Sequence, residues 1–228
     1  MRIALALYAS LWTGASAVAQ DYALPTAMQF IERAGTQKAR SGDSEWSSEV
    51  LLRYSLIGGG GNGAKWSDDF SDGFGLRGEG DYEYHINSQW SVGGYLSTGF
   101  DIFGGKTIQG FTLDDLLVIP FTIGAKGKVY FGQGFFGELY LGFGFVDYSA
   151  VGISGPGGSL PVWTDSIAFA LEVGGHIGYK LDQKFALVFG VGYENWGHPG
   201  VDQSGPAAGV PQHPIENVTI DLGIWFRF

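Results

Sequence analysis

Apolar and polar residues alternate with a period of two along most of the chain after residue 47. The clearest stretch is 74–86, where one face carries only apolar residues and glycines and the other carries charged residues and one glycine. The two faces are Phe74, Leu76, Gly78, Gly80, Tyr82, Tyr84 and Ile86 against Gly75, Arg77, Glu79, Asp81, Glu83 and His85. Successive side chains of a β-strand point to opposite faces, whereas a helix would mix these two sets. The pattern therefore predicts a strand between an apolar and a polar environment.

The same alternation recurs in seven further segments. They are residues 49–57, 90–103, about 116–130, 134–146, 165–181, 185–196 and 216–228. Most of them reach the roughly 9–11 residues that a tilted transmembrane strand needs. An even number of such strands can close without an exposed edge, which lipid does not tolerate. The sequence predicts an all-β fold, an eight-stranded antiparallel transmembrane up-and-down β-barrel over residues 47–228.

The connections between these segments alternate in length. The short ones are 87–89, 131–133 and 182–184, and the long ones, rich in Gly, Pro, Asp and Ser, are 58–73, 104–115, 147–164 and 197–215. Short periplasmic turns and long extracellular loops are typical of outer-membrane barrels. This polarity predicts a protein of the bacterial cell outer membrane with extracellular long loops and both termini in the periplasm.

Aromatic residues gather near both ends of the predicted strands, as in the two interfacial girdles of such barrels. They are Trp90, Phe135, Tyr179, Phe185 and Phe226 at the short turns and Phe74, Phe100, Phe145 and Tyr193 at the long loops. A soluble lipocalin-type barrel would place its apolar face inside and its polar face outside. The apolar face of this chain is too continuous for water, so we expect it to contact lipid.

The N-terminal residues read as a targeting segment. Arg2 precedes a short apolar run, and Ala17 and Ala19 fit a small-residue cleavage site before Gln20, so residues 1–19 are predicted to be a cleaved signal peptide. Residues 20–46 have no strand pattern, and we expect a periplasmic segment or a lumen plug.

The amino-acid composition is typical of a transmembrane barrel and excludes some classes of partner and site. The 228 residues include 39 glycines and 15% aromatics but only 16% charged residues, whereas soluble domains carry about a quarter charged residues. The net charge of −10 gives a nucleic-acid partner no electrostatic support. There are no cysteines, which excludes disulfides, thiolate metal sites and cysteine nucleophiles.

The glycine and aromatic texture of residues 137–145 and the ending Ile224-Trp225-Phe226-Arg227-Phe228 resemble the small outer-membrane barrel superfamily, with its OmpX-like, OmpW-like and OmpA-like domains. The resemblance covers about residues 47–228. It implies that Phe226 and Phe228 form the signal read by the barrel assembly machinery. It also implies outer-membrane lipid and lipopolysaccharide as the surroundings.

The predicted inward face is heavily ionic. We expect a lumen charge network, which is also a candidate ion path, of Arg53, Arg77, Glu79, Asp81, Glu83, His85, Lys126, Glu138, Glu172, His176 and Glu194, accompanied by Glu49, Asp101, Lys128, Lys180, Asp221 and Arg227. Turns centred on Ser88, Gly132 and Gln183 set a trial register. It places Glu83 opposite Gly93, Lys126 opposite Glu138, His176 opposite Gly190 and Glu172 opposite Glu194.

An eight-stranded barrel is wide enough only for its own side chains or one narrow guest. The leading interpretation is therefore a closed network of salt bridges in a non-enzymatic protein with a structural or surface-interaction role. The Glu172/Glu194 pair needs a cation or a shared proton, unless Arg53 or another base reaches it. The alternatives are a narrow, weakly cation-preferring passage and an OmpW-like route for small solutes, for which Leu51, Phe136, Val188 and Trp225 provide a partial apolar gallery.

A lipid A-modifying enzyme is the least favoured alternative. The lipid A deacylase family carries a His followed two positions later by Ser-Asn, and the nearest stretch here, residues 194–200, has no serine beside His198. No nucleophile, base and orienting group come together in the pattern. We expect no enzyme activity, no cofactor and no metal, with both inward histidines serving as network members.

The long loops contain aromatic and acidic residues that we expect to be exposed. They are Trp66, Asp68, Asp69, Phe70, Asp72, Asp114, Asp115, Trp163, Asp165, His198, Asp202 and His213. We expect solvated loops among lipopolysaccharide headgroups, with adhesion or partner binding as the alternative; the loop partner is unknown. Proline removes a ladder hydrogen bond, so Pro120 predicts a bulge near the outer rim of its strand.

Overall fold

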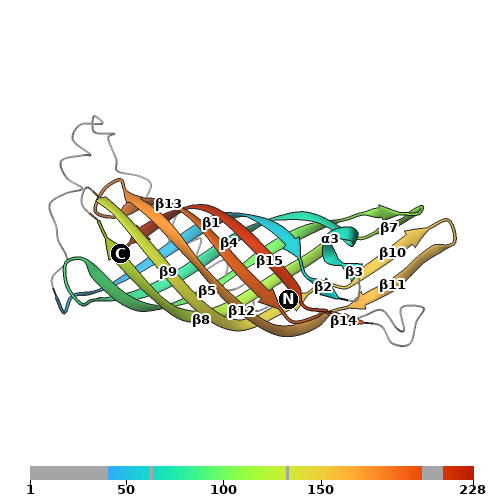
Figure 1. Ribbon diagram of the computed structural model, residues 1–228, viewed down its shortest axis with the longest axis horizontal. Helices are drawn as coiled ribbons and strands as arrows, with labels where there is room; N and C mark the ends of the chain where they lie inside the picture. The colour runs from blue at the N-terminus through green and yellow to red at the C-terminus, as the bar shows by residue number, and fades with distance from the viewer. Residues whose placement is uncertain (1–40, 62–63, 132–133, 202–212) are drawn as a thin grey trace.

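The computed structural model describes residues 41–61, 64–131, 134–201 and 213–228 (Figure 1). In this part of the chain, eight long strands close an antiparallel barrel. They are β1 (Ser44–Gly58), β4 (Phe70–His85), β5 (Trp90–Gly105), β8 (Leu116–Tyr130), β9 (Phe135–Tyr148), β12 (Ser166–Lys180), β13 (Phe185–Trp196) and β15 (Ile215–Arg227). Each lies on one of the eight predicted segments, which confirms the predicted fold class.

Each long strand pairs with its neighbours along the chain, and β1 pairs with β15 to close the barrel. Strand β1 begins at Ser44, three residues before the predicted start of the barrel. The predicted signal peptide, residues 1–19, lies outside the described residues, as does most of the segment 20–46.

The trial register is confirmed at two of the three short turns. Glu83 pairs with Gly93, and His176 and Glu172 pair with Gly190 and Glu194. At the remaining turn the prediction is wrong, since Glu138 lies opposite Lys128 and Tyr140 lies opposite Lys126. The backbone N–H of Phe131 donates to the carbonyl of Phe135 at 2.8 Å, so the turn is centred one residue later than expected. The resulting slip of two residues keeps every side chain on its predicted face.

Pro120 interrupts strand pairing without the predicted bulge. On the β9 side, Pro120 pairs with Val146 in an unbroken register. On the β5 side, pairing stops after Thr98 and resumes at Asp101 in the same register. Because proline lacks an N–H, it removes a ladder bond without requiring an extra residue. The Thr98 hydroxyl donates to the Pro120 carbonyl at 3.1 Å across this gap.

The outer surface of the barrel is apolar, as the alternation predicts. Large exposed side chains on this surface include Leu52, Phe74, Leu139, Phe143, Phe145, Ile167, Phe169, Ile177, Phe189 and Leu222. For example, 74% of the surface of Leu139 is exposed. The described residues contain no helix that is long and apolar enough to cross a membrane.

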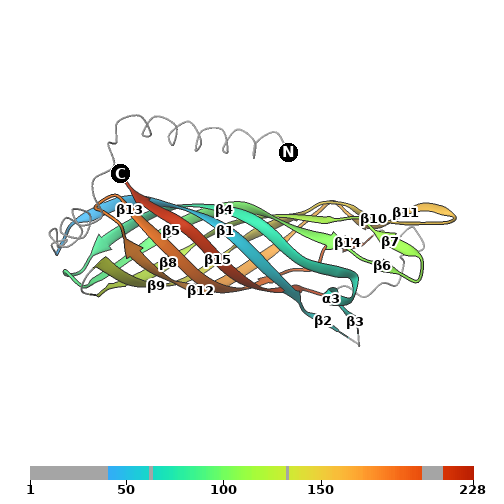
Figure 2. The same ribbon diagram turned by 90° about the horizontal axis from the view of Figure 1, so that it is seen from above.

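The long loops fold into a β-structure that continues the barrel wall beyond its end. A five-stranded sheet is formed by β6 (Thr107–Ile108), β7 (Phe111–Leu113), β10 (Val151–Gly155), β11 (Gly158–Thr164) and β14 (Gly200–Val201). Figures 1 and 2 show this sheet at the end of the molecule opposite the C-terminus. On the other side of the opening lie the short pair β2 (Gly60–Gly61) and β3 (Ala64–Lys65) and a helical turn, α3 (Trp66–Asp69).

Several predicted loop residues are therefore not exposed. Trp66, Phe70 and Trp163 are buried in an apolar cluster at the extended end. Two loop carboxylates accept backbone hydrogen bonds, Asp114 from Gly152 N–H at 3.1 Å and Asp165 from Ala150 N–H at 2.6 Å. These contacts fix the extended sheet on the barrel instead of leaving free loops.

Inward glycines allow adjacent strands to approach, and we expect Gly93→Ala to test this. A Cβ at Gly93 would lie 2.1 Å from the carbonyl oxygen of Tyr82 on β4, whereas nothing lies within 4 Å of a Cβ at the outward Gly80. Overpacking of this kind costs about 1–3 kcal/mol. Urea unfolding followed by tryptophan fluorescence should show a lower midpoint for Gly93→Ala and an unchanged midpoint for Gly80→Ala. Equal midpoints for the two variants would contradict the close approach.

Candidate functional site: a charged lumen between two apolar clusters

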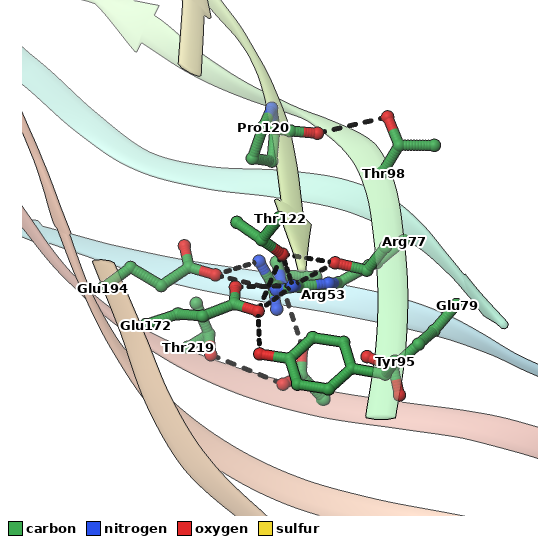
Figure 3. Close-up of polar contacts among 12 residues, drawn as sticks. Arg53, Arg77, Glu79, Tyr95, Thr98, Pro120, Thr122, Glu172, Glu194 and Thr219 are labelled. Atoms are coloured by element: carbon green, nitrogen blue, oxygen red, sulfur yellow. Dashed lines mark hydrogen bonds and ion pairs between the residues drawn. The ribbon is translucent and has the colours of Figure 1, made fainter. Parts of the chain in front are cut away.

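Two arginines extend into the lumen near its middle and contact carboxylates of other strands (Figure 3). Arg53 on β1 donates to Asp221 on β15 at 2.9 Å and to Glu194 on β13 at 2.6 Å. Arg77 on β4 donates to the same Glu194 carboxylate at 3.0 Å and also to Glu172 on β12. Arg77 thus bridges the predicted Glu172/Glu194 pair, and Arg53 adds a second positive partner to Glu194.

Glu172 is the most heavily hydrogen-bonded carboxylate in this group. Besides Arg77, it accepts bonds from the Tyr95 hydroxyl at 2.5 Å and the Thr122 hydroxyl at 2.8 Å. Arg77 also donates to the hydroxyls of Ser97 and Thr122. Charged groups in a low-dielectric interior persist when such bonds satisfy them. The contacts link β4, β5, β8 and β12 across the lumen.

A second group surrounds Lys126 closer to the short turns. Its ammonium contacts Glu79, and lies 2.6 Å from Asp81, 3.0 Å from Glu138 and 3.8 Å from Glu49. These carboxylates come from β4, β9 and β1, so one side chain of β8 connects four walls of the barrel. The Lys126–Glu138 ion pair exists although the two residues are not direct strand partners.

Lys128 extends this group toward the short-turn end of the lumen. Its ammonium contacts Glu83 and lies 3.1 Å from Glu138. His176 joins the two groups, because its ring nitrogens lie 3.5 Å from Glu49, 3.3 Å from Glu138 and 3.8 Å from Asp221. The lumen therefore contains one connected network of charges.

Acids outnumber bases in this network. Among the described residues, the buried carboxylates are Glu45, Glu49, Glu79, Asp81, Glu83, Asp101, Glu138, Glu172, Glu194 and Asp221. The buried bases are Arg53, Arg77, Lys126 and Lys128, with the imidazoles of His85 and His176. Uncompensated buried charge is costly. Protons or cations must therefore supply part of the compensation.

An apolar cluster, which we call the short-turn cluster, lies in the lumen at the end with the short connections. It consists of Leu51, Phe136, Ala186, Val188 and Trp225, with Tyr130 packed against it. The ammonium of Lys128 lies 4.9 Å from the Phe136 ring centroid, and that of Lys180 lies 4.4 Å from the Tyr130 ring centroid. The residues predicted to form a partial apolar gallery thus form a packed cluster. Two lysines make cation–π contacts with its aromatic rings.

A larger apolar cluster, which we call the long-loop cluster, fills the opposite end. Its members include Ile57, Trp66, Phe70, Phe103, Leu116, Val118, Val146, Tyr148, Trp163, Trp196 and Ile215. The Trp163 ring lies 5.4 Å from that of Trp66 and 5.8 Å from that of Phe70. The Trp66 indole N–H also donates to the Pro214 carbonyl at 3.2 Å. These contacts anchor α3 across the mouth of the barrel.

The polarity of the outer and inner surfaces of the barrel shows which environment the protein occupies. A closed barrel that is apolar outside and charged inside is stable only where lipid surrounds it. The chain is a transmembrane β-barrel.

No protein-family model and no curated protein sequence matches the chain. Among solved structures, Neisserial surface protein A is similar at 12% identity, covering 82% of this chain and 99% of its own, with a TM-score of 0.49. Ail of Yersinia pestis (19%, 82% and 99%, TM-score 0.42) and OprG from Pseudomonas aeruginosa (14%, 84% and 98%, TM-score 0.46) are also similar. At these identities the likeness concerns the fold alone.

The barrel places the eleven main residues of the predicted lumen network inside. Arg53, Arg77, Glu79, Asp81, Glu83, His85, Lys126, Glu138, Glu172, His176 and Glu194 are all buried. Arg227 instead lies at the rim, with 37% of its side chain exposed. At the C-terminus the rings of Phe226 and Phe228 are 5.7 Å apart, and Phe228 is 79% exposed.

The predicted network lacked its neutral members, and the long-loop cluster was not predicted. Tyr95, Ser97 and Thr122 have the inward parity of their strands, so the alternation contained the signal, although the predicted network included only charged residues and histidines. The same parity marks Phe103 and Trp196 as inward. The sequence around Trp66 does not predict its burial, because that burial depends on the fold of its loop.

We expect Arg77→Met to destabilise the barrel strongly, because it leaves Glu172 and Glu194 with fewer positive partners. Breaking a buried pair from one side costs about 3–5 kcal/mol. Urea unfolding in detergent micelles measures the loss. The double variant Arg77→Met/Glu172→Gln should recover part of it, since one uncompensated charge is removed. An additive double variant would contradict direct coupling of the two residues.

Proposed function

We propose that this outer-membrane barrel is a non-enzymatic protein with a closed lumen that acts at the cell surface. The observation that carries the proposal is the crossing of the lumen by Arg53 and Arg77, which reach carboxylates on β12, β13 and β15. A side-chain lattice of this kind occupies the space that a permeating solute needs. The protein would then contribute a rigid support and an extracellular surface.

The two apolar clusters support a closed lumen. Any hydrated ion would have to pass the short-turn cluster, the charge network and the long-loop cluster in turn. Trp225 and Trp196, one in each terminal cluster, are both among the largest fully buried side chains of the described residues. A dry, packed constriction opposes ion passage, because apolar side chains offer an ion no replacement for its hydration shell.

The extended sheet supports a role at the surface. We place it outside the cell, with both termini in the periplasm, because long connections of outer-membrane barrels are extracellular. Exposed carboxylates lie on or beside this end: Asp68, Asp72, Asp114, Asp115, Asp147, Asp165 and Glu216. We propose that the nearest of them meet lipopolysaccharide phosphates through divalent cations and that the sheet itself carries the partner-binding surface.

The arrangement of residues 194–200 does not favour a lipid A-modifying enzyme. Glu194 is buried in the lumen and held by two arginines, whereas His198 is exposed beyond the end of β13. An acid and a base that face different environments do not form a catalytic pair.

Purified protein in planar lipid bilayers should give no single-channel conductance at any voltage. This result is expected because the lumen is filled along its length. A variant with Arg53→Ser, Arg77→Ser, Phe136→Ala and Trp196→Ala, if it inserts, should show conductance and serves as the positive control. Regular conductance steps from the wild type would instead support the ion-passage alternative, and uptake of apolar solutes into liposomes would support an OmpW-like route.

The surface role is tested by complementation of a deletion strain. We expect a variant in which residues 152–162 are replaced by a two-residue turn to fold and insert but to lose cell adhesion. The outer-membrane barrier to a hydrophobic dye should be retained. The matched control is Arg77→Lys, which changes the lumen and leaves the sheet intact; it should keep adhesion. Full adhesion by the trimmed variant would contradict a role for the sheet.

We propose that Phe226 and Phe228 act in recognition by the barrel assembly machinery. Removal of Phe228 should therefore lower the amount of assembled barrel in cells, measured by heat-modifiable migration in gels. Refolding of the same variant into detergent should be little changed, since Phe228 contributes a single backbone bond of 3.2 Å to Trp46. A similar loss in both assays would point to stability instead of recognition.

A further inference from the structure

Glu45, Glu83 and His85 form a compact group at the periplasmic end of the lumen. Glu45 lies near the start of β1, and Glu83 and His85 lie at the end of β4. One side-chain ligand atom from each lies within 4.8 Å of the other two, and all three residues are buried. The backbones at this point are tied together, since Gly42 N–H donates to the His85 carbonyl at 2.9 Å.

The imidazole of His85 is incompletely satisfied. Among the described residues, neither of its ring nitrogens has a hydrogen-bond partner, although the residue is only 2% exposed. Its Nε2 lies 3.4 Å from Glu45 Oε2, and the ring packs 5.7 Å from that of Tyr130. Glu45 Oε1 is likewise buried without a hydrogen-bond partner. Buried polar atoms without a hydrogen-bond partner are rare in folded proteins, and a bound ion is one explanation for them.

We propose that Glu45, Glu83 and His85 bind a divalent transition metal, with Zn²⁺ as the reference ion. One imidazole nitrogen and two carboxylate oxygens are a ligand set that Zn²⁺ accepts, and water completes the coordination. The free Glu45 oxygen and the unpartnered imidazole supply two of the ligands. The site departs from the expectation that both inward histidines are network members only.

The surroundings resemble a second coordination shell. Arg227 lies 2.8 Å from Glu45 Oε2, which leaves Oε1 available. Glu83 is held by Lys128, by the Ser91 hydroxyl at 2.9 Å and by the Tyr130 hydroxyl at 3.0 Å. Such contacts fix the orientation of ligating carboxylates. A metal here would also reduce the excess of acid in the lumen.

The group has access to solvent from the rim. Glu45 itself is 6% exposed, and its partner Arg227 has 37% of its side chain exposed. In the orientation proposed above, this rim faces the periplasm. A metal bound there would clamp β1 to β4, beside the point where the barrel closes.

Two other groups with suitable spacing are poorer candidates. Glu49 with Glu138 and His176, and Glu49 with Glu79 and Asp81, also bring ligand atoms together. The ammonium of Lys126 already lies among these carboxylates, 2.6 Å from Asp81 and 3.0 Å from Glu138. A metal would have to displace this ammonium from several carboxylates at once, whereas Lys128 contacts only one member, Glu83, of the group of Glu45, Glu83 and His85.

The test uses the full chain refolded in detergent micelles after removal of metals with a chelator. Zn²⁺ alone is titrated into the protein, and the amount of bound metal is measured by inductively coupled plasma mass spectrometry. Co²⁺ then replaces Zn²⁺ as a spectroscopic probe. We expect one metal per barrel, visible-range Co²⁺ absorption, and a higher unfolding temperature in the presence of Zn²⁺ because only the folded state forms the site.

The variants distinguish specific metal binding at the proposed site from non-specific metal binding elsewhere on the protein. His85→Gln should lower Zn²⁺ affinity at least about tenfold and abolish the Co²⁺ absorption, and Glu45→Gln should weaken both. His176→Gln and the exposed-loop variant His198→Gln should bind as the wild type does. Heat-modifiable migration verifies folding, and if His85→Gln fails to fold, Glu45→Gln decides. Unchanged binding by His85→Gln or Glu45→Gln, loss of binding by His176→Gln or His198→Gln, or no stoichiometric binding by the wild type would overturn the proposal.

Discussion

The pairing of β1 with β15 is the interaction on which the other features of this protein depend. It completes the ring of backbone hydrogen bonds, so no strand edge remains to meet lipid. The seam is also joined by side chains, because Arg53 lies opposite Asp221 and donates to it at 2.9 Å. Once the ring is closed, alternate side chains have only two destinations, the bilayer and a narrow lumen.

The narrow lumen explains why the charges are arranged as a network. In a space filled by side chains, each ionic group must find its partners on other strands. Glu194 is thus shared by Arg53 and Arg77, and Lys126 serves several carboxylates at once. Inward glycines such as Gly93 and Gly190 provide the space that large neighbours occupy, as Gly190 does for the His176 ring. Charge and volume are therefore balanced together along the tube.

The ends of the lumen are organised differently from its middle. At the short-turn end, Phe136 and Trp225 pack inside the barrel and support the alkylammonium groups of two lysines. At the other end, Trp66 and Phe70 of the first long connection pack against Trp163 of the third. The same aromatic contacts lie across the mouth of the barrel and hold the extended sheet, so the lumen closure that we propose and the surface structure depend on one cluster.

The sequence by itself determined the eight strands, the face of each side chain and the ionic character of the interior, because a period of two in an extended chain leaves little freedom. It also placed two of the three tight turns in register. It did not locate the turn after β8, where a slip of two residues preserves the alternation and so leaves no trace in the pattern. Nor did it reveal the absence of a bulge at Pro120, or the burial of Trp66 and Trp163. Which acid meets which base, and where His85 lacks a partner, was decided only by the tertiary structure, because barrel closure brings together residues that are far apart in the chain.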